Sequence, residues 1–224
     1  PRATHALRSY LFAPADNPRI LDKVFNAAAD AVVLDLEDAV APSAKAAARE
    51  TLRKNLETLS PTDAPPVWVR INPVGSGMWR DDLAAVVGPW LSGIRIAKAQ
   101  DPEAIERVAE FLELREATAD MATGSVSLTL TIESAMGVEN CEEQARCDRV
   151  TNLWFGTVDF LADIGATDAE DGVAALYAHS KVVLASRVAA IGPPIAPVQT
   201  RLDDDDALRA STQRFRNVGF FGRS

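Results

Sequence analysis

Carboxylate side chains follow apolar, strand-like runs at three points of this chain. The segment AVVLDLEDA closes with Asp35, Glu37 and Asp38. The alternating run SLTLTIES brings Glu133 to its end, and Asp159 lies just beyond the run TNLWFGTV. Acids at the carboxyl ends of buried parallel strands are where α/β enzymes place their chemistry. The sequence therefore predicts an active site at that edge of a sheet.

Oxygen ligands of this kind suit a hard divalent cation. Mg²⁺ is usually bound by one or two carboxylates and keeps several waters. We expect Glu133 and Asp159, at the ends of neighbouring predicted strands, to be its ligands, although each alone could be a solvated acid or a helix N-cap. Glu37 and Asp38 are expected to hold metal-bound waters, since five carboxylates cannot all coordinate one Mg²⁺. Either could instead cap the following helix.

A permanent cation ends a fourth run, PPVWVRIN, at Arg70. A guanidinium binds a carboxylate through two parallel hydrogen bonds, which lysine cannot reproduce. We expect Arg70 to hold the carboxylate of an anionic substrate, and we predict Arg70, Glu37 and Asp38 as the catalytic residues. The alternative for Arg70 is a structural salt bridge to the acids of LDLED.

Two further basic residues, Arg19 and Lys23, follow the turn PADNP at positions i and i+4 of a predicted helix. They therefore share one helix face at the rim of the sheet, where a phosphate group could bind. The alternative is a solvated basic face paired with Asp22 or Asp16.

The overall composition limits the possible partners and compartments. The formal charge of -9 and the pI near 4.8 argue against nucleic acid or an anionic membrane as the main partner. No apolar stretch approaches eighteen residues and no leader pattern opens the chain, so we expect a cytoplasmic protein with no membrane partner. Its 224 residues are expected to form a single domain, residues 1–224.

Strand-like and helix-like segments alternate along the whole chain. This βα order predicts a parallel sheet with right-handed crossovers. A doubly wound sheet and a TIM-like (β/α)8 barrel are the candidates. The barrel is favoured because acids end several strands and the first βα turn, PADNPR, is no dinucleotide fingerprint. The predicted strands are Ser9 to Ala13, Ala31 to Leu36, Val67 to Ile71, Gly93 to Ala97, Val126 to Ile132, Val150 to Phe155 and Ile195 to Val198.

The predicted helices lie between and after these strands: Asn17 to Ala29, Ser43 to Leu59, Asp81 to Leu91, Asp101 to Thr118, Val138 to Arg146, Asp171 to Ile191 and Asp203 to Asn217. Seven βα repeats are one short of a closed barrel. The final segment GFFGRS resembles the approach to an eighth strand, and we expect that strand to be absent from the chain.

Seven motifs occur here in the order found in one protein family. They are RSYLFAPADNPRILDK, DAVVLDLEDAVAPSAKAAAR, VWVRINP, GIRIAKAQ, TIESAMGV, FGTVDFLADIG and VGFFGRS. The chain thus resembles the citrate lyase β-subunit-like family of the HpcH/HpaI aldolase superfamily, which includes malyl-CoA and citramalyl-CoA lyases. The resemblance implies a TIM-like barrel, Mg²⁺, and reversible carbon–carbon cleavage of a 3-hydroxyacyl thioester carried on CoA or an acyl carrier.

The resemblance also implies roles for single residues. Glu133 matches the family's metal-binding glutamate, and Asp159 matches the aspartate of its G-x-x-D motif. Arg70 matches the substrate-binding arginine, and Arg19 and Lys23 match the pair that binds the CoA phosphates.

Two features depart from the family pattern. Ala97 stands where proline usually precedes the lysine that matches Lys98. Family members usually continue beyond the GF-x-G-[KR] segment into a strand and into helices that cover the active site, whereas this chain ends at Ser224. We therefore expect the C-terminal lid to be absent and the biological protein to be longer.

These observations predict a Mg²⁺-dependent carbon–carbon lyase for a citryl-, malyl- or citramalyl-CoA type thioester. The alternatives are an acyl-CoA thioesterase on the same scaffold and a non-catalytic subunit that binds an acyl-carrier partner. A homo-oligomer, trimer or hexamer, is expected.

Overall fold

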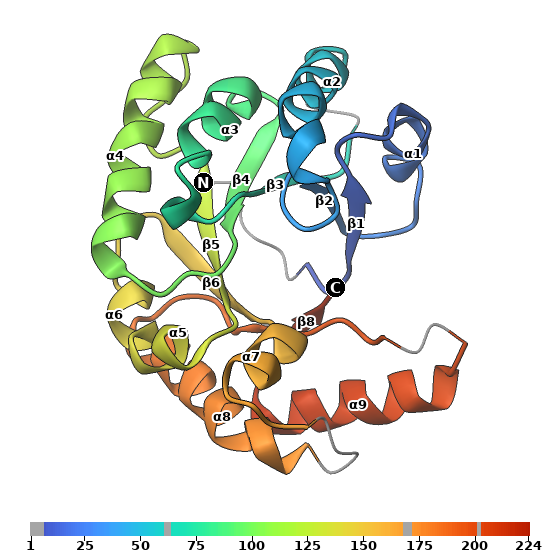
Figure 1. Cartoon of the computed structure of the whole chain (residues 1–224), viewed down its shortest axis with the longest axis vertical. Helices are drawn as coiled ribbons and strands as arrows, with labels where there is room; N and C mark the ends of the chain where they lie inside the picture. The colour runs from blue at the N-terminus through green and yellow to red at the C-terminus, as the bar shows by residue number, and fades with distance from the viewer. Residues whose placement is uncertain (1–6, 61–63, 168–171, 201–202) are drawn as a thin grey trace.

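Eight parallel strands form one continuous sheet that curls into a barrel (Figure 1). The computed structural model describes residues 7–60, 64–167, 172–200 and 203–224. Each strand pairs with the next one in sequence, and at least one helix connects them, as expected for repeated βα units. The strands are β1 Tyr10–Pro14, β2 Ala31–Asp35, β3 Val67–Ile71, β4 Leu91–Ile96, β5 Ser127–Ile132, β6 Val150–Phe155, β7 Ile195–Ala196 and β8 Gly222–Arg223.

The helices surround this barrel (Figure 1). Several begin where the sequence offers a capping side chain: Asp101 accepts a hydrogen bond from the Glu103 amide, and Asp204 accepts one from the Ala207 amide. In the described part of the chain the α-helices are α1 Pro18–Val24, α2 Lys45–Glu57, α3 Trp79–Val86, α4 Pro102–Thr118, α5 Ala135–Glu139, α6 Cys141–Ala145, α7 Thr157–Asp163, α8 Val173–Val188 and α9 Asp205–Val218. Two short 3-10 helices, Pro42–Ala44 and Val74–Ser76, precede α2 and α3. None of them is long and apolar enough to span a membrane.

The expectation that the eighth strand is absent was wrong. Residues 222–223, within the segment GFFGRS, form β8, which pairs in parallel with β7 through Ile195 with Gly222 and Ala196 with Arg223. On its other side Arg223 forms a bridge to Ser9, and its amide donates to the Arg8 carbonyl at 2.8 Å. A two-residue strand is too short for its hydrophobic pattern to reveal it. The lid expected beyond Ser224 stays a prediction.

Two apolar layers hold the barrel together. The larger lies between the outer face of the strands and the helices, and includes Val32 and Leu34 of β2. The smaller fills the inside of the barrel and includes Ala31 and Val33 of β2. Because successive side chains of a strand point to opposite faces, the Asp35 side chain points into the barrel, as those of Ala31 and Val33 do. Strand phasing in the sequence did not decide this orientation.

One predicted helix differs from the structure at Asn140. The single helix expected over Val138 to Arg146 is two short helices, α5 and α6, which meet at Asn140. The Asn140 side chain donates to the Gln100 carbonyl at 2.8 Å, which fixes this break. Asp159 lies just beyond β6, as predicted, in the first turn of α7. The start of the helix expected from Asp171 lies outside the described residues.

Candidate active site

Asp35 and Arg70 form a two-point ion pair inside the barrel. They are directly paired on β2 and β3, and the Arg70 guanidinium donates from Nε to Asp35 Oδ1 at 2.7 Å and from Nη2 to Oδ2 at 2.5 Å. Asp35 is 1% exposed and also accepts the amides of Glu37 and Ala39. These contacts fix Asp35, and Asp35 in turn orients Arg70. The alternative weighed for Arg70, a salt bridge to LDLED, is therefore present.

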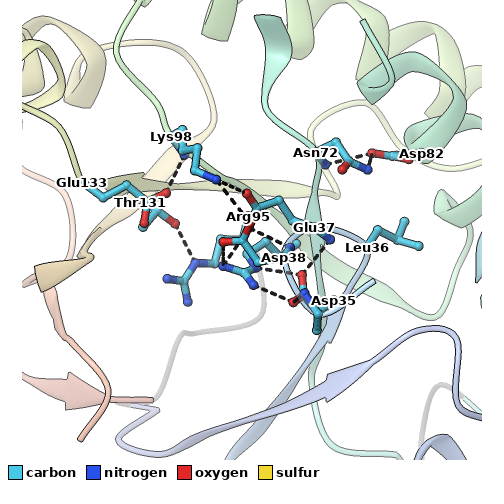
Figure 2. A network of polar contacts seen from close by, with 12 residues as sticks. Asp35, Leu36, Glu37, Asp38, Asn72, Asp82, Arg95, Lys98, Thr131 and Glu133 are labelled. Atoms are coloured by element: carbon cyan, nitrogen blue, oxygen red, sulfur yellow. Dashed lines mark hydrogen bonds and ion pairs between the residues drawn. The ribbon is translucent and has the colours of Figure 1, made fainter. Parts of the chain in front are cut away.

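Glu37 lies between two cations. Its Oε2 is 3.0 Å from Arg70 Nη1, and its Oε1 accepts from Lys98 Nζ at 2.6 Å. Burial raises the pKa of Glu37, and a hydrogen bond with Asp38 acts in the same direction. Asp38 is more exposed and lies 3.3 Å from Lys98 Nζ. Figure 2 shows these acids and Lys98 converging on one side of the barrel. Three of the predicted residues, Arg70, Glu37 and Asp38, thus belong to one network.

Lys98 links this network to Glu133. Its backbone N–H donates to Glu133 Oε1 at 2.7 Å while its Nζ reaches Glu37 (Figure 2). Lys98 has a left-handed backbone with φ of 50°, which is unfavourable for a residue with a side chain. Strained backbone persists where surrounding contacts fix it, and such sites are often functional. Lys98 matches the family's lysine, which follows Ala97 here instead of proline, but it was not among the predicted site residues.

Glu133 is a buried carboxylate that interacts with charges of both signs. Burial raises its pKa to about 7, and the charges of Asp159 and Glu37 act in the same direction against the Lys98 amide and Arg95. Gly156 leaves room for its carboxylate, because a Cβ atom at residue 156 would lie 2.7 Å from Glu133 Cβ and would also overlap Oε2. Gly156 is three residues before Asp159, so the G-x-x-D motif combines this space with the second acid.

The side chains of this site fit a magnesium ion, which needs few protein ligands, better than a metal whose ligands are all protein side chains. Among the described residues there is no group of three or more His, Cys, Asp and Glu side chains arranged to hold a metal. Mg²⁺ commonly needs one or two carboxylates, with waters and substrate completing its shell. Glu133 and Asp159 are the two carboxylates that could hold it, and a bound cation would favour the charged form of Glu133, whose pKa burial raises to about 7. The residues therefore fit Mg²⁺.

Lys45 anchors the loop that carries Glu37 and Asp38. Its ammonium group is buried and donates to the carbonyl oxygens of Leu36 at 2.7 Å and Glu37 at 2.6 Å. Since buried polar groups need partners, these two bonds stabilise the turn directly after β2. The predicted alternative for Glu37 and Asp38, capping of the next helix, is not observed, because α2 has no side-chain cap.

Arg95 is a second guanidinium inside the barrel. It is paired in register with Arg70 on the neighbouring strand, is 6% exposed, and donates from Nε to Thr131 Oγ1 at 2.8 Å. Its guanidinium lies 3.9 Å from the Trp154 ring centroid and 4.9 Å from that of Phe12. Burial, followed by the charge of Arg70, lowers the pKa of Arg95 to about 9. Figure 2 shows Arg95 beside the acidic network, with its contact to Thr131.

The loop after β3 is held by Asp82, whose side chain is fully buried. Asp82 accepts hydrogen bonds from the backbone and side-chain nitrogens of Asn72, both at 2.8 Å (Figure 2). It also accepts one from Arg49 at 2.6 Å. Asp82 therefore supports the loop structurally, at a distance from the Arg70 network.

Arg19 and Lys23 lie on α1, away from the acidic network. Both are exposed, and neither forms an ion pair with any residue that the structure describes, so the alternative pairing with Asp16 or Asp22 is not observed. Their spacing on one helix leaves two neighbouring cations available to an anion.

Residues 8–224 match the protein family described as HpcH/HpaI aldolase/citrate lyase. The chain belongs to this family. The prediction of the family, and with it of an enzyme related to citrate lyase β and malyl-CoA lyases, is thereby confirmed.

The names of curated relatives of this HpcH/HpaI family member describe two kinds of enzyme, lyases and thioesterases. The citrate lyase subunit beta-like protein of Deinococcus radiodurans is 34% identical over 97% of this chain and 74% of its own length. A (3S)-malyl-CoA thioesterase of Cereibacter sphaeroides is 32% identical over 98% of this chain and 73% of its own. The L-malyl-CoA/beta-methylmalyl-CoA lyase of the same species is 32% identical over 96% and 74%.

Solved structures of the family share the barrel. The citrate lyase beta subunit of Mycobacterium tuberculosis in complex with oxaloacetate and magnesium has a TM-score of 0.78 and 27% identity, covering 98% of this chain and 91% of that one. The CitE protein of the same organism, in complex with magnesium, acetoacetate and coenzyme A, has a TM-score of 0.73 and 28% identity over 97% and 76%. The predicted (β/α)8 fold is confirmed.

Proposed function

We propose that this HpcH/HpaI family member is a Mg²⁺-dependent carbon–carbon lyase acting on a CoA thioester of a hydroxylated di- or tricarboxylic acid. The substrate is of citryl-, malyl- or citramalyl-CoA type, and the products are an acyl thioester and a keto or aldehyde acid. The observation that carries the proposal is the position of the buried Glu133, which the Lys98 backbone joins to the network of Arg70, Glu37 and Lys98.

The reaction requires stabilisation of two charges. Cleavage next to a thioester removes the hydroxyl proton and leaves an enolate, while the acid fragment keeps its carboxylate. When bound by Glu133 and Asp159, Mg²⁺ would supply a Lewis acid for the oxygens of the acid fragment. Solved relatives named with oxaloacetate or acetoacetate together with magnesium support this cofactor.

Arg70 binds the substrate carboxylate in this proposal. Two of its three nitrogens donate to Asp35 and the third faces Glu37, so its orientation is set before substrate arrives. Nη1 and Nη2 each carry a second N–H, which remains for the substrate. A fixed guanidinium loses little freedom on binding, which favours a precise orientation of the acid fragment.

Glu37 and Asp38 hold protons and water beside the reacting oxygen. The raised pKa of Glu37 brings its proton affinity closer to the range useful for acid–base chemistry. Lys98 keeps this acid pair charge-balanced, since it contacts both carboxylates. Arg19 and Lys23 bind the CoA phosphates, and their exposure, without an ion-pair partner among the residues that the structure describes, supports this role.

A thioesterase is the second candidate, because one relative is named (3S)-malyl-CoA thioesterase. In that reaction water attacks the thioester carbonyl and releases free CoA with the intact hydroxy acid. The lyase instead leaves the thioester unbroken and releases acetyl-CoA with a keto or aldehyde acid.

The distinguishing experiment is a product assay with malyl-, citramalyl- and citryl-CoA in the presence of Mg²⁺. Acetyl-CoA with glyoxylate, pyruvate or oxaloacetate supports the lyase, whereas free CoA with malate, citramalate or citrate supports the thioesterase. Asp159→Asn serves as the inactive control for contaminating activity. No product from any thioester would contradict both and would favour the non-catalytic, carrier-binding subunit.

We also propose that residues 1–224 act as a single domain and assemble as a homo-oligomer. The continuous sheet supports the first statement. The second is supported by exposed apolar residues on α8, Val173, Tyr177, Leu184 and Val188, which are 54% to 68% exposed. Light scattering after size exclusion measures the assembly, and a monomer that stays fully active would contradict it.

A further inference from the structure

Arg95 is a buried cation without an ion pair. It lies on β4 with only 6% of its surface exposed, and it forms no salt bridge with any residue that the structure describes. Its hydrogen bond to Thr131 uses Nε–H, whereas Nη1 is buried and has no hydrogen-bond partner in the described chain. A buried guanidinium is normally paired, because removing its charge from water is costly. An unpaired one therefore indicates an anion that arrives from outside the chain.

Two aromatic rings hold this guanidinium in place. Its central carbon lies 3.9 Å from the Trp154 ring centroid and 4.9 Å from that of Phe12. Such contacts use the face of a guanidinium and leave the N–H groups at its edge unused. Nη1 and Nη2 carry four N–H groups, and none of them donates to a residue that the structure describes. Arg95 is thus fixed without the use of its terminal donors.

The acids that act on the pKa of Arg95 already have closer partners. They are Glu133, Asp35 and Glu37. Asp35 is held in a two-point ion pair, Glu37 lies between two cations, and Glu133 accepts a backbone amide. Burial, followed by the charge of Arg70, still lowers the pKa of Arg95 to about 9. The acids of the described network therefore offset the charge of Arg95 only in part.

Arg95 lies beside the arginine that binds the substrate in the proposed function. Arg70 and Arg95 are paired in register on β3 and β4. Thr131, which accepts the Arg95 hydrogen bond, is two residues before Glu133 on the next strand, β5 (Figure 2). In strand order Arg95 therefore lies between Arg70 and Glu133. An acid fragment that contacts both of these residues or their metal has Arg95 as its neighbour.

The acid fragments of the candidate substrates differ in charge. Malyl- and citramalyl-CoA give glyoxylate and pyruvate, which have one carboxylate each, whereas citryl-CoA gives oxaloacetate, which has two. Arg70 is sufficient for one carboxylate. A second carboxylate matches the free edge of Arg95, because a guanidinium binds a carboxylate through two parallel hydrogen bonds. The pair of arginines therefore fits the fragment with two carboxylates.

We propose that Arg95 binds a second carboxylate of the acid fragment and so selects citryl-type thioesters over the malyl and citramalyl types. This inference rests on the proposed function and narrows its substrate class. Arg70 orients the carboxylate next to the reacting carbon, and Arg95 neutralises the other one. A ligand that lacks the second carboxylate leaves Arg95 buried and unpaired. Sites of this kind discriminate strongly against such ligands.

The test compares two acids that differ only in this group. Oxaloacetate and 2-oxobutyrate have the same chain length, and a methyl group in 2-oxobutyrate replaces the second carboxylate of oxaloacetate. Each freshly dissolved acid is titrated into the protein with Mg²⁺ at constant ionic strength, and calorimetry gives the Kd. We expect the wild type to bind oxaloacetate at least about tenfold more tightly. Equal affinities, or tighter binding of 2-oxobutyrate, would overturn the proposal.

Two variants and a control assign the preference to Arg95. Arg95→Met removes the charge and fills similar space, so the ratio of the two affinities should fall close to one. The barrel should tolerate it, because an apolar side chain carries no charge that must leave water. Arg95→Gln is also neutral but can still donate to Thr131, and it gives the same test if Arg95→Met does not fold. Arg107→Met, an exposed arginine of α4, should keep the wild-type ratio. A full preference in a folded Arg95 variant would overturn the proposal.

The outcomes separate this inference from the proposed lyase activity. Binding of the acids needs no turnover, so a preference that disappears in Arg95→Met supports the inference even if the enzyme proves to be a thioesterase. In product assays, kcat/KM for citryl-CoA relative to citramalyl-CoA should fall at least about tenfold in Arg95→Met. A wild type that cleaves both without preference would keep the proposed function and overturn the role of Arg95. Failure of both acids to bind would instead contradict the acid-fragment site on which the two proposals depend.

Discussion

Arg70 is held in one orientation by Asp35, through two parallel hydrogen bonds across neighbouring strands. Asp35 is itself fixed by two backbone amides of the following loop. The position of the guanidinium thus depends on the strand register and on the turn, and little on substrate. Asp35, which was not among the predicted site residues, therefore sets the orientation of Arg70, which was.

Replacing Arg70 tests this arrangement. Arg70→Lys keeps the charge but cannot form the two-point pair with Asp35, so we expect kcat to fall by about a hundredfold through misorientation. Steady-state kinetics with the preferred acyl-CoA gives the value. Arg53→Lys, an exposed arginine of α2 in a surface ion pair, is the matched control. Wild-type kcat in Arg70→Lys would remove Arg70 from the site.

The metal assignment is tested by two isosteric changes. Asp159→Asn and Glu133→Gln each remove a negative oxygen ligand, so Mg²⁺ affinity should fall at least about tenfold and turnover should nearly vanish. Isothermal calorimetry measures the affinity, and circular dichroism checks that the barrel remains folded. Glu110→Gln, on the exposed face of α4, should bind Mg²⁺ normally. Unchanged affinity in both site variants would refute the ligand assignment.

Gly156 tests the space around the Glu133 carboxylate. In Gly156→Ala the new Cβ would lie 2.7 Å from Glu133 Cβ, so the carboxylate must move. We expect weaker Mg²⁺ binding and a loss of stability of about 1–3 kcal/mol. Chemical denaturation and calorimetry give the two values. Gly75→Ala, where no atom lies within 4 Å of the added Cβ, should behave as the wild type in both. Normal metal binding in Gly156→Ala would show that the carboxylate position is not critical.

His179 should make the protein sensitive to acid. Its pKa is about 4 in the folded state, below the usual 6.5, so the folded state binds fewer protons than the unfolded state between these values. Stability from this group is present above pH 6.5 and is lost as the pH falls through 4. Between pH 6.5 and pH 4 the wild type should therefore lose up to about 3 kcal/mol of its free energy of unfolding relative to His179→Phe, which has no imidazole to protonate. Urea unfolding of both proteins across this pH range measures the difference. Free energies of unfolding that change equally with pH in the two proteins would contradict the mechanism.

Arg19 and Lys23 should act on the carrier rather than on the chemistry. Arg19→Ala and Lys23→Ala are expected to raise KM for the CoA ester several-fold with kcat nearly unchanged. Because both residues are exposed, the effect should shrink at high salt. Arg146→Ala, a surface arginine paired with Glu142, is the control. A fall in kcat at unchanged KM would contradict a role in CoA binding.

The order of strands and the positions of Arg70 and Glu133 followed from the sequence because apolar runs of five or six residues end clearly in a charge. The orientation of Asp35 did not follow, since the acids of LDLED lie where the strand ends and its alternation stops defining a face. Lys98 was missed as a linking residue because its role depends on a left-handed backbone that no residue pattern announces. Arg95 was missed for another reason: it is buried against Phe12 and Trp154, which belong to other strands and lie far from it in the sequence.

The short strand β8 has a consequence for how this chain folds. The pairing of Ser9 with Arg223 joins residues from opposite ends of the described chain. Loop-closure entropy makes such a contact among the slowest to form, while each earlier strand pairs with a neighbour that is close in sequence. The seam between β8 and β1 is therefore expected to form after the folding transition state. Substitutions there should accelerate unfolding and leave the rate of folding almost unchanged.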